Sequence, residues 1–294
     1  MNRAVELVST GSELLNGRTV NRHANVLGDR LKPLGLPLVR DTTVPDDVNL
    51  IEDAIRFALQ RVDIVVVTGG LGPTCDDVTR DAIARMLGRK IVMDALSLAA
   101  LQARFQKMGR KVTPQGELQA QVVEGAAALS NSVGAAPGER LDLGDKVLFV
   151  LPGPPDEFHA VLTEHVLPWL RQNAGPLCLP VEQIFMVCGL GESDIMRRLE
   201  EIGFAPKGIE VAYCAAPGRI ELRLTSPEGD RGLVESASRD VRRVLGDHAF
   251  AEERLTMEEV VGRLLTEQKV RLATAESCTG GLVGHRITNV SGSF

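Results

Sequence analysis

Aromatic residues are scarce in this sequence. Phe, Trp and Tyr make up 3% of its 294 residues, and Trp169 and Tyr213 are the single Trp and the single Tyr. A folded core therefore has to be built mostly from aliphatic side chains. Hydrophobic residues reach 44% and charged residues 24%, which is ordinary for a globular protein and excludes a disordered or collagen-like chain.

Long apolar runs and a leader pattern are also missing. No segment approaches the roughly 18 to 20 consecutive apolar residues that a membrane-spanning helix needs, so no membrane partner is expected. The N-terminus carries Glu6 and lacks the apolar stretch of a signal peptide. We expect the protein to remain in the cytoplasm.

Extended basic runs and paired cysteine motifs are absent as well. The chain has 33 Lys and Arg against 39 Asp and Glu, a net charge of −6, so nucleic acid is not an expected partner. The cysteine number is odd, and no C-x-x-C spacing occurs. This pattern predicts reduced thiols and argues against a disulfide framework or a zinc site. The five cysteines are Cys75, Cys178, Cys188, Cys214 and Cys278.

The first 170 residues alternate short strand patterns with helical patterns. This order predicts an α/β fold with a doubly wound, mostly parallel sheet. The run VDIVVV at 62–67 is nearly all β-branched, which is typical of a parallel strand buried on both faces. Strands are predicted at 4–9, 36–44, 62–67 and 146–151, and helices at 20–34, 47–61, 77–87, 95–108, 115–124 and from PGPPDEF to residue 170.

The remainder of the chain has a different organisation. A linker is predicted at 172–180, followed by a small α+β region with one wet sheet face. The last forty residues predict a helix, a strand at 270–275 and a second helix, which together cannot bury their own apolar faces. Three domains are expected, at 1–171, 181–252 and 255–294, the last of them an incomplete α/β segment. The elements expected in the second are strands at 184–187 and on both sides of the turn 216–218, with helices at 193–202 and 232–245.

A glycine-rich segment, TGGLGPTCDDVT at 68–79, carries the strongest local signal. Gly69, Gly70 and Gly72 allow a sharp turn whose backbone N–H groups face outward, which is a natural seat for phosphate beside a helix N-terminus. Asp76 and Asp77 add carboxylates suited to a divalent cation that bridges protein and phosphate. A tight strand-to-helix turn, with one of these aspartates as N-cap, remains an alternative.

Two further polar loops are predicted at the same sheet edge. TGSELLNGRTVN at 10–21 follows the first strand, and LPGPPDEF at 151–158 places acidic residues at a helix start. Each loop alone is also compatible with ordinary helix-start chemistry. Because open α/β sheets bind ligands at their carboxyl edge, three such loops together favour a shared ligand site.

These motifs resemble those of the competence-damage-inducible CinA family. TGGLGPTCDDVT, GSELLNG, NSVGAAPGE at 131–139 and LPGPPDEF are similar to its N-terminal domain, which has a molybdopterin-binding-like fold. CGLGESDI and GIEVAYCAAPGRIELRLT resemble its KH-like middle domain, and ATAESCTGGLVGHRIT resembles the start of its amidase domain. The likeness covers essentially the whole chain.

The resemblance implies a pyrophosphatase of pyridine-nucleotide salvage, which hydrolyses ADP-ribose to AMP and ribose 5-phosphate with Mg²⁺, Mn²⁺ or Co²⁺. It implies Asp76, Asp77 and Glu157 as catalytic residues, the two aspartates also holding the metal. A homodimer is expected, with a small-molecule nucleotide as substrate. The implied substrate-binding residues are Thr10, Gly11, Glu13, Asn21, Gly69, Gly70, Gly72, Thr74, Asn131, Gly134, Gly138 and Asp156.

The amidase resemblance places the family nucleophile at Ser277. In full-length members this domain is a nicotinamide mononucleotide deamidase. Because the segment here covers only its beginning, no deamidase activity is expected. If the protein continues past residue 294, a nicotinamide-nucleotide amidase is the alternative.

The sequence also departs from the family pattern. Ser12 replaces an Asp, and Asn21-Arg22-His23 stands where the family often has Asn-Thr-Asn. The middle segment 189–192 is not a G-x-x-G loop, so it lacks the device with which KH modules clamp RNA. A non-catalytic protein that binds a pterin or a nucleotide, and a degraded member that only forms structure, therefore remain alternative functions.

Overall fold

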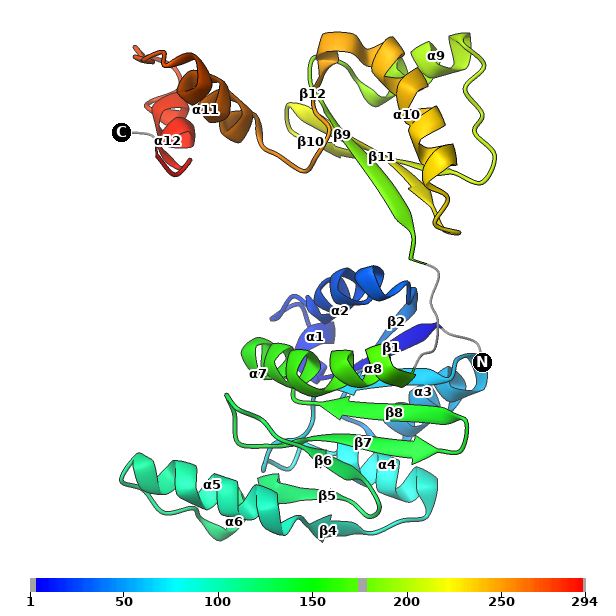
Figure 1. Cartoon of the computed structure of the whole chain (residues 1–294). Coiled ribbons are helices and arrows are strands. Elements are labelled where there is room, and N and C mark those ends of the chain that lie inside the picture. The colour runs from blue at the N-terminus through cyan, green and yellow to red at the C-terminus, as the bar shows by residue number, and fades with distance from the viewer. Residues whose placement is uncertain (1–3, 174–178, 293–294) are drawn as a thin grey trace. The chain divides into compact units, whose positions relative to one another are not determined.

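The structure is a computed structural model that describes residues 4–173 and 179–292 (Figure 1). The chain divides into two compact units, Met1–Leu177 and Cys178–Phe294. In the described residues no helix is both long enough and apolar enough to cross a bilayer. Within the same residues Cys75, Cys188, Cys214 and Cys278 are free thiols, as predicted, whereas Cys178 lies outside them.

A six-stranded sheet forms the centre of the first unit. Its first four strands in spatial order are parallel, and the last two are antiparallel to their neighbours. This confirms the predicted doubly wound, mostly parallel sheet. The spatial order is β2 (Leu38–Val44), β1 (Val5–Thr10), β3 (Ile64–Thr68), β8 (Lys146–Leu151), β7 (Gly138–Leu143) and β6 (Ala127–Leu129).

Helices cover both faces of this sheet (Figure 1). Because successive strand residues point to opposite faces, Val66 packs with the helices on one face of the sheet, whereas Val65 and Val67 pack with those on the other. All residues of β3 are buried, as its β-branched run predicts. The helices are α1 (Ser12–Leu15), α2 (His23–Leu31), α3 (Val48–Arg61), α4 (Thr79–Leu87), α5 (Ala95–Lys107), α6 (Pro114–Glu117), α7 (Pro155–Val161) and α8 (Leu167–Asn173).

The predicted helix at 115–124 is wrong beyond its first turn. Helix α6 ends at Glu117, a 3₁₀ turn occupies Leu118–Ala120, and β5 (Gln121–Val123) pairs antiparallel with β4 (Ile91–Met93). Helix propensity is overridden here because the β-branched Val122 and Val123 are buried against a distant strand. The predicted helix at 20–34 is shorter as well, since a 3₁₀ turn containing Pro33 follows α2.

The second unit contains a four-stranded antiparallel sheet. Ile220, Leu222 and Leu224 are buried in alternation along β11, which confirms the predicted sheet with one packed face. Its elements are β9 (Val181–Val187), β10 (Glu210–Ala216), β11 (Arg219–Ser226), β12 (Ala249–Ala251), α9 (Glu192–Glu201) and α10 (Arg231–Leu245). Of the predicted linker at 172–180, residues 174–178 lie outside the described residues, and α8 reaches Asn173.

The final segment contains α11 (Met257–Gln268) and α12 (Leu282–Thr288), and neither helix has a buried residue. The strand predicted at 270–275 is wrong, because these residues are exposed and in no strand. An alternating apolar pattern becomes a strand only where a neighbouring strand accepts its hydrogen bonds.

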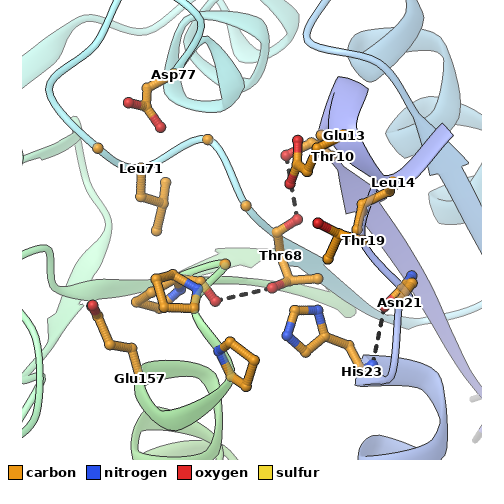
Figure 2. Close-up of a pocket in the computed structure, with 18 of the residues that line it drawn as sticks. Thr10, Glu13, Leu14, Thr19, Asn21, His23, Thr68, Leu71, Asp77 and Glu157 are labelled. Carbon is orange, nitrogen blue, oxygen red and sulfur yellow. Dashed lines mark hydrogen bonds between the residues drawn. The ribbon is translucent and has the colours of Figure 1, made fainter. Parts of the chain in front are cut away.

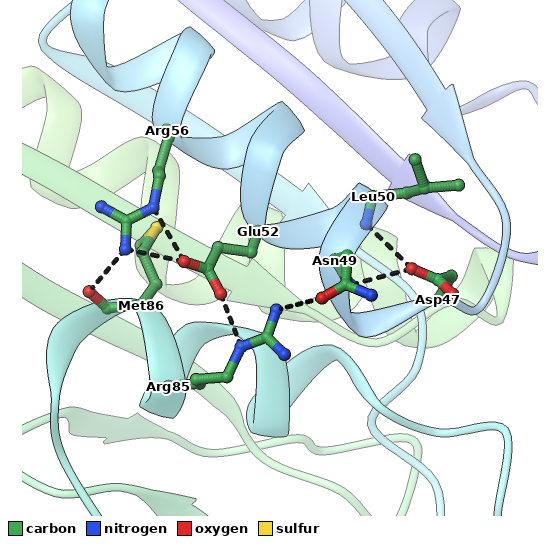
Figure 3. A network of polar contacts seen from close by, with 7 residues as sticks. All are labelled: Asp47, Asn49, Leu50, Glu52, Arg56, Arg85 and Met86. Carbon is green, nitrogen blue, oxygen red and sulfur yellow. Dashed lines mark hydrogen bonds and ion pairs between the residues drawn. The ribbon is translucent and has the colours of Figure 1, made fainter.

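A polar network links α3 to α4, the helix that follows the glycine-rich loop (Figure 3). Glu52 accepts hydrogen bonds from Arg56 and, across the helix pair, from Arg85. These guanidinium groups lower the pKa of Glu52. The side chain of Asp47 caps α3 by accepting from the backbone N–H groups of Asn49 and Leu50 at 2.9 and 3.0 Å.

We expect Asp47→Ala to lower the free energy of unfolding by about 1 kcal/mol, because two N–H groups of the first turn lose their acceptor. Urea unfolding followed by circular dichroism measures the change. Asp53→Ala, on the exposed side of the same helix, is the control and should stay within about 0.5 kcal/mol of the unmodified chain. Equal losses in both variants would contradict the capping role.

Candidate functional site

A cavity of about 670 Å³ opens at the carboxyl ends of β1, β3 and β8 (Figure 2). Three loops line it, as the topological rule for open sheets predicts. Ten of the sequence-predicted site residues are in its lining: Thr10, Gly11, Glu13, Asn21, Gly69, Gly70, Gly72, Asp76, Asp77 and Glu157.

The glycine-rich loop needs its glycines for two reasons. Gly69 and Gly70 have φ of +105° and +64°, which side-chain-bearing residues rarely adopt. A Cβ on Gly69 would collide with the Thr10 carbonyl, and one on Gly70 with the Thr79 hydroxyl. The Thr10 and Thr79 hydroxyls are themselves 3.0 Å apart. The loop is therefore pressed against β1 and α4, with its backbone open to the cavity.

The two adjacent aspartates differ in their surroundings. The Thr74 N–H donates to Asp77 Oδ2 at 2.9 Å, and the Thr74 hydroxyl donates to the same oxygen. Neither aspartate caps α4, whose N-cap is Val78 without a side-chain hydrogen bond, so the N-cap alternative is wrong. Hydrogen bonding in this turn, chiefly from Thr74, lowers the pKa of Asp76, which favours its charged form beside the cavity.

A buried ion pair between Arg80 and Glu139 contacts the glycine-rich loop. Arg80 Nε donates to Glu139 Oε1 at 2.8 Å, and their side chains are 7% and 0% exposed. Arg80 Nη1 donates to the Leu71 carbonyl at 2.9 Å, and Val123 N–H donates to Glu139 Oε2 at 2.9 Å. Burial raises the pKa of Glu139, while Arg80 and the Val123 N–H oppose the rise. The pair thus connects the glycine-rich loop to α4, β5 and β7.

The loop after β1 is tied to the loop after β2. Ser12 N–H donates to Asp46 Oδ2 at 2.8 Å, and Asp46 N–H donates to Ser12 Oγ at 3.2 Å. Asp46 lines the cavity, yet our sequence analysis missed it. The available signal was the carboxyl end of β2, which reaches the same sheet edge as β1 and β3. Asn21 donates to Ser9 Oγ at 2.9 Å and accepts from the His23 N–H at 3.0 Å, so it fixes the end of this loop.

Glu157 enters the cavity from the third loop. Its Oε2 accepts from Asn131 Nδ2 at 2.7 Å, and Asn131 Oδ1 in turn accepts from the Gly134 N–H. A Cβ on Gly134 would collide with Glu157. Asn131 and Gly134 therefore position Glu157 from behind and do not line the cavity themselves.

Three further predicted residues also lie outside the lining. Thr74 holds the turn through Asp77. Gly138 is buried in β7, where a Cβ would meet Val161 and the Val150 carbonyl, so its smallness serves packing. Asp156 is exposed in the first turn of α7. Lining residues that our sequence analysis did not assign to the site include Leu14, Thr19, His23, Val26, Leu71 and Gln119.

The carboxylates constrain how a cation would bind. Among the described residues, no three His, Cys, Asp or Glu side chains gather in a group suited to hold a metal ion. Asp76 and Asp77 alone form an incomplete ligand set. This donor set fits a hard cation such as Mg²⁺, which commonly uses one or two carboxylates and completes its shell with phosphate oxygens and water.

The predicted nucleophile of the last segment lies in an exposed turn. Ser277 comes directly after Glu276, whose carboxylate accepts from the N–H groups of Val283 and Gly284 at 2.9 and 2.8 Å. These N–H groups belong to the first turn of α12, where unengaged N–H groups could stabilise an oxyanion. In this structure Glu276 engages them.

Comparison with known proteins identifies the family. The family model described as "Probable molybdopterin binding domain" matches residues 6–172. A protein of Caldicellulosiruptor saccharolyticus named as competence-damage inducible is 35% identical over 292 residues, covering 98% of this chain and 71% of the relative. The chain belongs to the CinA family. The models "Damage-inducible protein CinA KH domain" and "CinA C-terminal domain" match residues 182–251 and 254–294.

Other CinA relatives agree with this assignment. The CinA-like protein of Akkermansia muciniphila is 38% identical over 291 residues, covering 98% of this chain and 69% of its own length. A crystal structure of the protein CinA from Thermoplasma acidophilum, described as of unknown function, is 36% identical, with a TM-score of 0.51. The match covers 55% of this chain and 95% of the Thermoplasma chain.

The buried ion pair makes a stability prediction. Glu139→Gln leaves the Arg80 charge buried without a counter-ion, so we expect it to lower the free energy of unfolding by about 3 kcal/mol or more. Urea unfolding measures this. Asp145→Asn, in an exposed turn of the same unit, is the control. Replacing both partners in Arg80→Met/Glu139→Leu should destabilise less than Glu139→Gln alone, because no charge is stranded. A double variant that is less stable than the single one would contradict this account.

Proposed function

We propose that this chain hydrolyses the phosphoanhydride bond of ADP-ribose, or of a related nucleoside diphosphate, with the help of a divalent cation. Water adds to one phosphorus, the bond from that phosphorus to the bridging oxygen breaks, and the products are AMP and ribose 5-phosphate. One observation carries the proposal. A rigid glycine-rich loop and several carboxylates line the same cavity at the carboxyl edge of the sheet.

The loop supplies the means to bind phosphate. Gly69 and Gly70 hold their backbone in the left-handed region, and consecutive N–H groups in such turns form a seat for anions. The Leu71 carbonyl is occupied by Arg80, which restrains the loop before a ligand arrives. Phosphoryl transfer depends mainly on such prior positioning and on charge stabilisation.

Charge balance gives the cation its role. Among the charged side chains of the described lining, acidic groups outnumber basic ones: Glu13, Asp46, Asp76, Asp77 and Glu157 stand against Arg22. A diphosphate would be repelled by this wall unless a cation neutralised it. Asp76 and Asp77 would hold that cation beside the phosphate seat. When bound, it would supply charge neutralisation for the phosphate oxygens.

Glu157 fits the role of general base. One of its carboxylate oxygens, Oε2, is held by Asn131 at 2.7 Å, which fixes the side chain at the cavity wall. The second oxygen, Oε1, is left to accept a proton from the attacking water. A base held by a neighbour in this way keeps its geometry while the proton moves.

Release of AMP from ADP-ribose, measured with Mg²⁺, Mn²⁺ or Co²⁺ added in turn, tests the proposal. We expect turnover that chelation with EDTA abolishes. Asp76→Ala should lower kcat/KM on the order of 100-fold, because the cation that neutralises the phosphate oxygens loses one of its ligands. Asp81→Ala, on the exposed side of α4 and outside the cavity lining, should retain full activity. Asp77→Ala is less diagnostic, because Thr74 also loses its acceptor.

A binding protein without catalysis is the second candidate. The engagement of Asp77 in the loop turn and the lack of a three-ligand group in the described residues favour it. It predicts that a nucleotide or pterin stabilises the fold with no turnover. At a ligand concentration of about 100 times Kd, the stabilisation would reach about 2.7 kcal/mol. If ADP-ribose stabilises the fold but no AMP is released with Mg²⁺, Mn²⁺ or Co²⁺, the proposed hydrolysis is overturned and this candidate is supported.

A further inference from the structure

His23 is the first residue of α2 and lines the same cavity. Its ring packs against Phe158 with 4.3 Å between ring centroids and an angle of 31° between the planes. Phe158 is 1% exposed and belongs to the core beneath. Among the described residues that line the cavity, His23 carries the one aromatic ring. The cavity thus has a single planar surface, and a buried phenyl ring supports it.

The His23 ring is held in the uncharged state. Its Nδ1 is buried and has no hydrogen-bond partner. Protonation would give the imidazole a positive charge and N–H groups on both nitrogens. The N–H on Nδ1 would have no acceptor, which makes the charged form unfavourable. Burial accordingly lowers the pKa of His23, and the nearby Gly153 carbonyl opposes this only in part. At neutral pH the ring is a flat, neutral and weakly polar group.

The cavity is chemically divided. In Figure 2 the Asp77 side chain lies on the far side of the cavity from the His23 ring, with Thr68 between them. The lining near His23 in sequence and in the third loop includes the apolar Val20, Val26, Pro152, Pro154 and Pro155, together with the polar or charged Thr19, Asn21, Arg22 and Glu157. A molecule with phosphate at one end and a flat ring at the other matches this division.

We infer that His23 is a specificity-determining residue, whose ring is the platform on which the nucleobase of the substrate stacks. The inference rests on the proposed function, because it assumes a nucleotide ligand. Phe158 covers one side of the ring, so the ligand approaches the other. With the base at His23, the phosphates extend toward residues 69–72. Stacking recognises any π-face, so this platform favours nucleoside diphosphates over diphosphates without a base.

Binding of AMP and of ribose 5-phosphate to the full chain, measured by calorimetry, tests the inference. His23→Ala should raise the Kd for AMP about tenfold, the size of effect expected when a base loses its stacking partner. Its Kd for ribose 5-phosphate should be unchanged, because that product carries no base. His23→Phe should keep most of the AMP affinity. His159→Ala, whose imidazole lies outside the cavity lining beside Arg30, is the control.

His23→Asn provides a second variant that keeps a polar side chain at the start of α2 if His23→Ala folds poorly. It should lose AMP affinity as His23→Ala does. Unchanged AMP binding in both variants would overturn the inference and leave the proposed hydrolysis standing. An equal loss in His23→Phe would overturn it too, because the nitrogens and not the ring face would then matter. If the unmodified chain binds neither AMP nor ADP-ribose, the proposed function fails, and the inference fails with it.

Discussion

The ion pair between Arg80 and Glu139 is the contact on which the candidate site depends. Both side chains are almost fully enclosed, so each charge has lost its hydration and requires the other. Arg80 also donates to the Leu71 and Gln119 carbonyls, and Glu139 accepts from the Val123 N–H. One charge pair therefore fixes the position of the glycine-rich loop relative to strands that lie some fifty or more residues further along the chain.

Hydrogen bonds from neighbouring residues also orient three carboxylates of the cavity wall. Thr74 occupies one oxygen of Asp77, Asn131 one oxygen of Glu157, and Ser12 one oxygen of Asp46. In each case the neighbour orients the carboxylate through one oxygen. The second oxygen takes no part in that hydrogen bond. Because these side chains are already ordered, less side-chain conformational entropy would be lost when a ligand binds. The loops can then present charge at fixed places on the cavity wall.

What the sequence predicts well is what local chemistry determines. The β-branched run of β3 and the glycines at 69 and 70 each leave few conformational choices, and the structure follows them. Residues 118–123 show the opposite case. Their helical character gives way because Val123 pairs with Ile91 and donates its N–H to Glu139. The strand predicted at 270–275 does not form. Those residues are exposed and pair with no neighbouring strand.

The candidate site divides in the same manner. The glycine-rich loop was predictable because the residues that determine its conformation lie in one short segment. For Asp46 the end of β2 gave only its place at the sheet edge, and its link to Ser12 is a tertiary contact. The His23 ring was not predictable, since its position depends on its contact with Phe158. No spacing along the chain encodes those contacts. A sequence pattern could locate the sheet edge, but only packing decides which side chains share it.

Ser12, at a position where the family resemblance predicts an Asp, illustrates how packing changes the meaning of a substitution. Ser12 donates its N–H to Asp46 and accepts the Asp46 N–H. A carboxylate at position 12 would lie beside the Asp46 carboxylate. Two carboxylates so close together repel each other, which raises the pKa of the pair unless a cation lies between them. Serine removes that repulsion and keeps the link between the two loops. Under the proposed function, Asp76 and Asp77 are the carboxylates of the glycine-rich loop itself, so a bound cation would be held mainly there.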